Sequence, residues 1–398
     1  MPTAELHESD RHPARGWSHP SPSTPAPLPH DPAAVALLPD RRRLVLRIAL
    51  IGAVVAALVL AVGSLPGLGD VRERLAGASP GWLALALALD AASCLACVVV
   101  LRGVFCRRMP WKLSYDVAMA AQGTNVLLPT GGAGGLAVVA WALRRTGMPA
   151  ERIGRRTVAF YVLTSAVNFT TAVLAGGLLA LGVLAGGGST ALTAGPALAA
   201  ALVIAGVLLL PRALASRAAS APRSGRAGRI IATVRGALSA GIGDAVLLTR
   251  SGNPQIIGGA IGYMALDAAA LGAAFAALGT VPPIGVLLLA YVVGQLGGLI
   301  PLPGGVGGAD GGLIAALVLY GTPLAAAAAA VLAYRAFQLG LPALLGAVAL
   351  ARLPGVVERA PAADAICEPR PPARSADGGR ARILTPRGAV AVGAGRAA

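Results

Sequence analysis

Charged side chains that interrupt apolar stretches are the first candidates for chemistry in this chain. An uncompensated charge is costly in an apolar medium, so such a residue is expected to have a fixed partner or a ligand. Three of the candidates are acids, which can bind protons or cations, and one is a base, which can bind an anion. They are Asp90, Asp267, Asp310 and Arg335.

Two glycine-rich runs are the second group of candidates. Residues 130–135 read TGGAGG and residues 303–308 read PGGVGG, and glycine permits the positive φ or close approach that a chain reversal needs. A helix that begins after the reversal presents free N–H groups and the positive end of its dipole. Such a terminus binds phosphate without a cationic side chain. We therefore expect the two runs to form one anion-attracting cavity.

The expected anion site combines glycines of both runs with two charged residues. It comprises Gly131, Gly132, Gly134, Gly304, Gly305, Gly307, Asp310 and Arg335. Arg335 is expected to contact a phosphate group, and an ion pair with Asp310 or Asp267 is the alternative. Asp310 follows the second run, where an acid suits helix capping better than ligand binding. Helix packing through GxxxG pairs, such as Gly131 with Gly135, is a second role open to the glycines.

Composition indicates a protein that crosses a membrane several times. The 398 residues are 56% hydrophobic and 13% charged, and the mean hydropathy is +0.72. Apolar runs of about 20 residues recur, enough to span a bilayer core of roughly 30 Å. The net charge of +16 comes from arginines in tails and loops, which the positive-inside rule explains without nucleic acid. We expect an all-α polytopic protein of the cell membrane, with both termini cytoplasmic and no nucleic-acid partner.

Six apolar runs are expected to be full transmembrane helices. They are residues 44–63, 82–105, 157–184, 192–210, 256–278 and 323–350. Residues 1–43 and 352–398 are rich in proline or arginine, so we expect two disordered tails around one transmembrane domain over 44–351. The cytoplasmic linker 212–254 has apolar residues at steps of four, typical of a helix on the membrane surface. A loosely structured basic loop is the alternative.

Two further apolar stretches, 113–143 and 284–320, contain the glycine runs near their centres. Basic residues flank the first stretch on both sides and no charge flanks the second. By the positive-inside rule, both ends of the first stretch lie inside, whereas both ends of the second fit outside. Each stretch therefore predicts a re-entrant hairpin of two half-helices. Irregular backbone at that depth requires a surrounding of protein or a water-filled cavity.

The arrangement of span, hairpin and span occurs twice, over 82–184 and over 256–350. Asp90 and Asp267 occupy the same place in two identical ALDAA pentapeptides of the first span of each half. Since the hairpins enter from opposite sides, the halves form an inverted-topology repeat, which is typical of transporters with a substrate site at the midplane. Coupling to protons or cations and acceptance of local hydrogen bonds are both open roles for the two acids.

These motifs resemble the lysylphosphatidylglycerol synthase transmembrane-region family of flippase-like membrane proteins. The second half supplies PLPGGVGGAD over 301–310 and the Tyr334-Arg335 pair, and the first half supplies NVLLP over 125–129. The resemblance covers 44–350 and implies that the domain moves lipids, such as aminoacylated phosphatidylglycerol, between leaflets. Many members have charges after the first glycine run, whereas 135–139 is neutral here, which leaves the carried lipid open. Only a short tail follows the last expected span, so we expect no soluble aminoacyltransferase domain.

A translocase for a phosphate-bearing lipid or lipid-linked precursor is therefore the first functional expectation. A secondary transporter of a small soluble substrate is the alternative. An intramembrane enzyme is disfavoured, because no histidine lies beyond His30 and the membrane acids are scattered. We expect no enzymatic activity, catalytic residue, metal or cofactor, and membrane lipids are the expected partners. The C-x-x-C of Cys94 and Cys97 lies in an apolar span, which indicates packing rather than redox chemistry.

Overall fold

The computed structural model describes residues 69–128, 132–186, 188–218, 226–297 and 308–367. These ranges are helices joined by turns, and they contain no strand. Five helices are long and apolar enough to cross a membrane. They are α4 (Pro80–Phe105), α7 (Ala150–Ala180), α8 (Thr190–Ala218), α10 (Pro254–Ala277) and α13 (Leu324–Glu358). The all-α, multispanning prediction is confirmed at this level, and the first expected span, 44–63, lies outside the described residues.

The remaining described helices are not among these five candidate spans. They are α3 (Gly69–Ala76), α5 (Trp111–Leu127), α6 (Ala133–Arg145), α9 (Arg226–Arg250), α11 (Ile284–Gly297), α12 (Gly308–Leu319) and α14 (Ala363–Cys367). The interruption between α5 and α6, and that between α11 and α12, fall at the two glycine runs. Both stretches are therefore pairs of short helices, as the hairpin prediction requires. Residues 129–131 and 298–307, at the centres of the interruptions, lie outside the described part of the chain.

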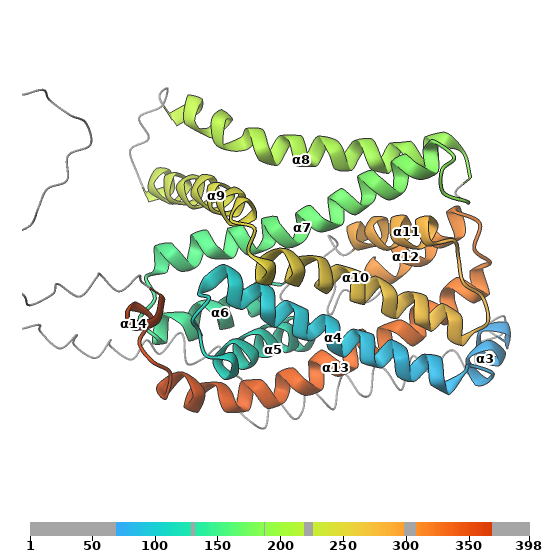
Figure 1. Cartoon of the computed structure of the whole chain (residues 1–398), viewed down its shortest axis with the longest axis horizontal. Helices are drawn as coiled ribbons and strands as arrows, with labels where there is room; N and C mark the ends of the chain where they lie inside the picture. Colours follow the sequence, from blue (N-terminus) through green and yellow to red (C-terminus); the bar gives the residue numbers. More distant parts are fainter. Residues whose placement is uncertain (1–68, 129–131, 187, 219–225, 298–307, 368–398) are drawn as a thin grey trace, which may run out of the picture.

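The order of long, short, short and long helices occurs twice, as α4–α7 and as α10–α13. The α5–α6 pair lies toward one end of the long helices, beside α14, and the α11–α12 pair lies toward the other (Figure 1). The first end exposes Arg107, Arg108, Arg144 and Arg145, and we call it the basic end. The turns at the opposite end, 181–189, 278–283 and 320–323, contain no charged residue.

Glycines let helices of the two halves pack closely. A Cβ on Gly259 of α10 would lie 2.8 Å from the backbone nitrogen of Val100 in α4. A Cβ on Gly123 of α5 would lie 2.6 Å from the Cα of Gly346 in α13. Neither contact leaves room for a side chain, so these positions join α4 to α10 and α5 to α13. The two halves are thereby packed against each other.

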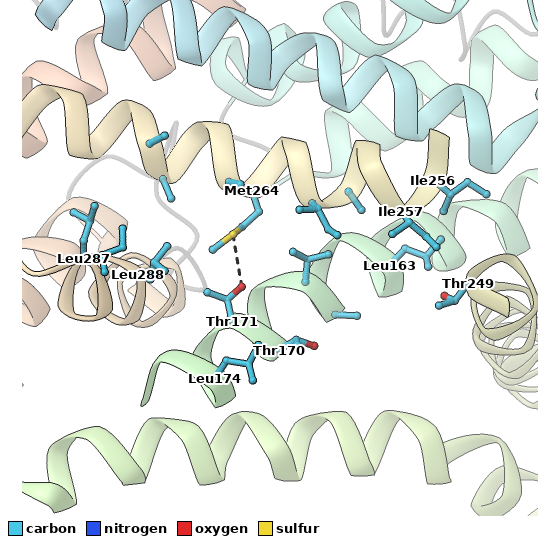
Figure 2. Close-up of a pocket in the computed structure, with 18 residues that line it drawn as sticks. Leu163, Thr170, Thr171, Leu174, Thr249, Ile256, Ile257, Met264, Leu287 and Leu288 are labelled. Atoms are coloured by element: carbon cyan, nitrogen blue, oxygen red, sulfur yellow. Dashed lines mark hydrogen bonds between the residues drawn. The ribbon is translucent and has the colours of Figure 1, made fainter. Parts of the chain in front are cut away.

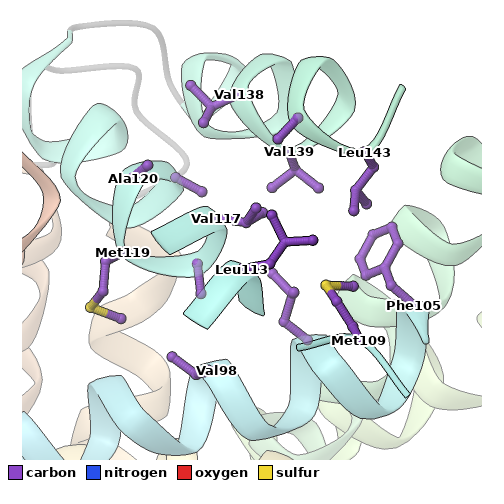
Figure 3. Packing of buried hydrophobic residues seen from close by; sticks show 14 of the residues in the cluster. Val98, Phe105, Met109, Leu113, Val117, Met119, Ala120, Val138, Val139 and Leu143 are labelled. Carbon is purple, nitrogen blue, oxygen red and sulfur yellow. The ribbon is translucent and has the colours of Figure 1, made fainter. Parts of the chain in front are cut away.

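Two groups of buried apolar side chains fill the bundle. One lies around α5 and α6, where Phe105 at the end of α4 and Met109 of the α4–α5 turn pack near Leu143 of α6 (Figure 3). The other lies among α10, α11, α12 and α13 and includes Phe275 and Leu289, both fully buried. The second group surrounds the part of α10 that carries an acid, which is where the candidate site lies.

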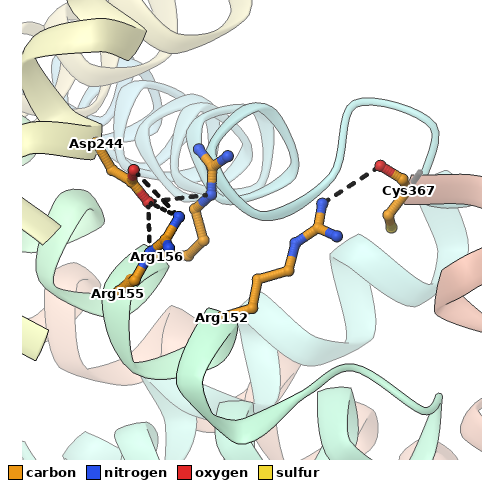
Figure 4. Close-up of polar contacts among 5 residues, drawn as sticks. All are labelled: Arg152, Arg155, Arg156, Asp244 and Cys367. Atoms are coloured by element: carbon orange, nitrogen blue, oxygen red, sulfur yellow. Dashed lines mark hydrogen bonds and ion pairs between the residues drawn. The ribbon is translucent and has the colours of Figure 1, made fainter. Parts of the chain in front are cut away.

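The linker between α8 and α10 contains α9, which is foreshortened in Figure 1 and so runs steeply across the long helices. Ile242 of α9 is buried, and Arg155 and Arg156 of α7 form salt bridges of 3.1 Å and 3.7 Å with Asp244 (Figure 4). The structure therefore contains a helix that packs on α7. The sequence had left two alternatives for this linker, a helix on the membrane surface and a loosely structured loop.

Residues 352–367, the described part of the expected disordered tail over 352–398, are mostly helical. Residues 368–398 lie outside the described part of the chain. Helix α13 continues to Glu358, because Leu353, Val356 and Val357 supply a buried apolar face beyond the expected span. Helix α14 follows, and a disulfide joins Cys367 to the end of α4 at residue 106. The sequence spacing of the cysteines had not indicated a disulfide, because the two partners are 261 residues apart.

Candidate functional site

Asp267 lies at the centre of a buried polar cluster formed by α10, α11 and α13. Its Oδ2 accepts hydrogen bonds from the hydroxyls of Tyr291 at 2.5 Å and Tyr334 at 2.9 Å. Gln338 Nε2 donates to the same oxygen at 3.3 Å and to the Tyr334 hydroxyl at 2.5 Å. Asp267 is only 7% exposed, so these three donors supply solvation that water provides elsewhere. We call Asp267, Tyr291, Tyr334 and Gln338 the Asp267 cluster.

Arg335 connects this cluster to α12. Its guanidinium forms an ion pair with Asp310, in the first turn of α12, and donates a hydrogen bond to Gln338 Oε1. The side chains of Arg335 and Asp310 are 17% and 19% exposed. The structure thus contains an ion pair with Asp310, which the sequence analysis gave as an alternative to phosphate contact for Arg335. Contact with a phosphate group stays a prediction, and it requires the phosphate to share or replace Asp310 as the anion.

Asp90 of α4 is close to the Asp267 cluster. It is 2% exposed and near enough to Asp267 for the two charges to interact. Among the described residues, Asp90 Oδ2 has no hydrogen-bond partner. The structure therefore brings together the two acids of the ALDAA pentapeptides, because their helices pack along each other. Their part in ion or proton coupling stays a prediction.

The first glycine run combines a turn with tight packing. Gly132 caps the N-terminus of α6 with φ of 90°, a conformation that favours glycine. The Gly135 amide donates to Asn125 Oδ1 at 2.8 Å, and a Cβ on Gly135 would lie 2.5 Å from that oxygen. One amide of the first turn is therefore already used by Asn125, and Gly135 has the packing role.

The other expected glycines are only partly placed. Gly134 lies half-buried in the first turn of α6. Gly131, Gly304, Gly305 and Gly307 lie outside the described residues. The prediction that both runs present amides to one anion therefore stays a prediction. The described neighbours of that run are the start of α12 and Asp310, which pairs with Arg335 and so places this end of the run beside the Asp267 cluster.

An apolar cavity of about 610 Å³ lies between α7, α10 and α11, with Thr249 of α9 at one end. Figure 2 shows its side chains converging on a space bordered by α7 and α10. The larger lining residues are Leu163, Leu174, Ile257, Met264, Leu287 and Leu288. Its few polar groups are threonine hydroxyls, of which that of Thr171 contacts Met264 Sδ at 3.8 Å. The lining suits hydrocarbon, and we call this cavity the apolar groove.

The apolar groove and the Asp267 cluster are formed by the same two helices. On α10, Met264 and Ala268 line the groove, whereas Asp267 bonds to α11 and α13. On α11, Leu288 lines the groove, whereas Tyr291 bonds to Asp267. Polar and apolar binding surfaces thus lie on neighbouring faces, an arrangement that suits an amphiphile. Sequence reasoning missed Tyr291, although it is the one polar aromatic residue within α11.

No group of three or more potential metal-ligating side chains occurs among the described residues.

Comparison with known proteins gives one finding. A family model described as "Lysylphosphatidylglycerol synthase TM region" matches residues 45–346, which is well over half of the chain. No curated protein matches the chain. The family match confirms the resemblance stated from the glycine motifs and the Tyr334-Arg335 pair, and it includes all the expected site residues from Asp90 to Arg335.

Proposed function

Because this chain belongs to the lysylphosphatidylglycerol synthase transmembrane-region family, a group related to lipid synthesis or translocation, we propose that it moves a phosphate-bearing lipid between leaflets. One observation carries the proposal: a polar cluster and an apolar groove lie on neighbouring faces of α10 and α11. A lipid needs both surfaces at once, whereas a small soluble substrate needs only the first. The lipid-linked precursors expected from the sequence also combine a phosphate-bearing head group with hydrocarbon.

The proposed mechanism depends on competition for Arg335. In the structure Asp310 pairs with this guanidinium, and a phosphate can form the same kind of bidentate pair with arginine as a carboxylate does. A phosphate head group that displaces Asp310 would lie beside Tyr334 and Gln338, whose donors are directed to Asp267 in this structure. The acyl chains stay in the apolar groove or in the bilayer. The head group crosses the membrane centre with its charge compensated, which lowers the barrier for flipping.

We propose the membrane topology expected from the sequence, with six spans and two re-entrant hairpins in inverted repeats. The α5–α6 and α11–α12 pairs lie toward opposite ends of the long helices (Figure 1), which supports inversion. Arginines gather at the basic end, which under the positive-inside rule supports the proposed cytoplasmic side for that end and for both termini of a cell-membrane protein. Each hairpin then brings its glycine run toward the middle of the bilayer.

Asp90 and Asp267 are proposed to couple translocation to an ion or proton. They are two buried acids on adjacent helices, and Arg335 is near enough to Asp267 for their charges to interact. A cation that enters between them removes a repulsion, and one that leaves restores it, so occupancy can favour one conformation over another. No covalent step is needed, so the proposed activity is transport and its partners are membrane lipids.

The test is lipid exchange in proteoliposomes with labelled lipids of different head groups. Four forms are compared: wild type, Arg335→Gln, Asp310→Asn and the double variant. Arg352→Gln, an exposed arginine further along α13, is the matched control. If Arg335 binds the phosphate, exchange is lost in both forms that lack Arg335 and retained in the control.

The double variant separates the two roles of Arg335. An ion pair that only stabilises the fold can be replaced by two neutral groups, whereas removal of one partner leaves an uncompensated charge. Restored exchange in the double variant would therefore contradict a phosphate contact. Absence of exchange by well-folded wild type for every lipid would contradict translocation itself and favour a soluble substrate.

A further inference from the structure

A second cavity lies at the basic end, away from Arg335. It has a volume of about 550 Å³ and is lined by the end of α4, the start of α7, the α9–α10 turn and Cys367. Four arginines contribute to its lining, and none of the described residues that line it is acidic. These arginines are Arg107, Arg108, Arg152 and Arg156. We call this cavity the basic pocket.

Only part of this positive charge is compensated. Asp244 pairs with Arg156 at 3.7 Å and with Arg155, which lies next to the pocket (Figure 4). In the described part of the chain no acid forms a salt bridge with Arg107, Arg108 or Arg152. One N–H of Arg152 donates to the Cys367 carbonyl at 3.3 Å. Three arginines therefore keep most of their donors for a ligand.

The wall of the basic pocket is held in place by local contacts. Asn253, 8% exposed, caps α10 by accepting from the Gln255 amide at 3.1 Å, and the positive end of the α10 dipole lies at the pocket. Arg102 holds α4, α5 and α10 together: it donates to the Met109 carbonyl at 2.8 Å and to Gln255 Oε1 at 3.3 Å, and it stacks on Trp111. Such a fixed, cationic concavity selects an anion.

The basic pocket adjoins the apolar groove. Pro254 of α10 lines the pocket, and Ile256 and Ile257, in the same turn of helix, line the groove. On α9, Leu248 lines the pocket and Thr249 lines the groove. We propose that the basic pocket binds the phosphate of an anionic phospholipid whose acyl chain enters the apolar groove. Basic pockets between transmembrane helices on the cytoplasmic side suit such head groups.

Binding of a fluorescent short-chain phosphatidylglycerol to the purified full chain in neutral detergent, read by anisotropy, tests this site. Arg107→Gln with Arg108→Gln is the test variant, since both side chains are exposed and outside any described salt bridge. Arg144→Gln with Arg145→Gln is the matched control, an exposed adjacent pair at the same end that does not line the pocket. The test variant is expected to bind at least about tenfold more weakly, and the control less than about twofold.

Competition by unlabelled ligands identifies the source of the phosphate. Phosphatidylglycerol is expected to displace the probe, whereas phosphatidylcholine and inorganic phosphate at the same concentration are not. Equal weakening in both double variants would show general surface attraction and overturn the site. Displacement by inorganic phosphate as effective as by the lipid would overturn the lipid assignment. Because the assay measures binding and not exchange, its result stands whether or not the chain proves to be a translocase.

Discussion

The contact between α5 and α13 gives a quantitative prediction for Gly346→Ala. The new Cβ would lie 2.4 Å from the Gly123 Cα and 2.7 Å from the Met119 carbonyl oxygen. Both neighbours are backbone atoms, so relief requires the helices to separate by about 1 Å, and overpacking of this kind costs about 1–3 kcal/mol. The helix propensity of alanine offsets up to about 1 kcal/mol of this loss. The expected net loss is about 1–2 kcal/mol.

Thermal unfolding of the purified protein in detergent measures this loss. A loss of this size lowers Tm by about 2–8 °C in a chain of 150–250 residues, and somewhat less in a longer one. Gly340→Ala is the matched control, because it lies on the same helix and a Cβ there meets nothing within 4 Å. The control is expected to keep or slightly raise Tm. Equal Tm values for the two variants would refute the close contact between α5 and α13.

Three further outcomes are expected. Gly135→Ala should lower Tm by a few degrees, since its Cβ meets backbone as well as Asn125; an unchanged Tm would contradict the packing role. Cysteines replacing the exposed Ala150 and Leu324 should react with a membrane-impermeant maleimide from the inside and the outside, respectively, with the parent protein as background; same-side labelling would contradict inversion. Maleimide should count two thiols in the unreduced, denatured protein and four after reduction, because Cys106 and Cys367 are bonded; four before reduction would exclude the bond.

The helices of the bundle were predictable because each depends on local sequence. Apolar runs long enough to span a bilayer gave the positions of α4, α7, α8, α10 and α13, and the glycine runs gave the two interruptions. The ALDAA pentapeptides marked Asp90 and Asp267, which the structure places close together because α4 and α10 pack through Gly259 and Val100. The repeated pentapeptide made the pairing of the two acids predictable, since it implied that they occupy equivalent places in two similar halves.

The partners of the site residues were not predictable, because they come from distant parts of the chain. From the sequence, Asp310, Asp267 and a phosphate group were all possible partners of Arg335. Only the packing of α12 on α13 shows that the partner in the structure is Asp310. Tyr291 lies in an apolar helix, where an aromatic residue ordinarily indicates packing, and its hydroxyl has a role only because Asp267 faces it. The segment after residue 352 is held by buried side chains of α13 and by a disulfide to residue 106, and local composition does not reveal these distant partners.

Helix α13 contacts both helix pairs, α5–α6 and α11–α12, and it contains a proline between the two contacts. Arg335 is attached to α12, and Gly346, about 16 Å further along the helix axis, is pressed against α5. Pro342 lies inside the helix between these two attachments, where it removes one backbone hydrogen bond and permits a bend. Helix α13 can therefore bend at Pro342, between its contact with α12 and its contact with α5. A bend at Pro342 would change the angle between the part of α13 that contacts α12 and the part that packs on α5.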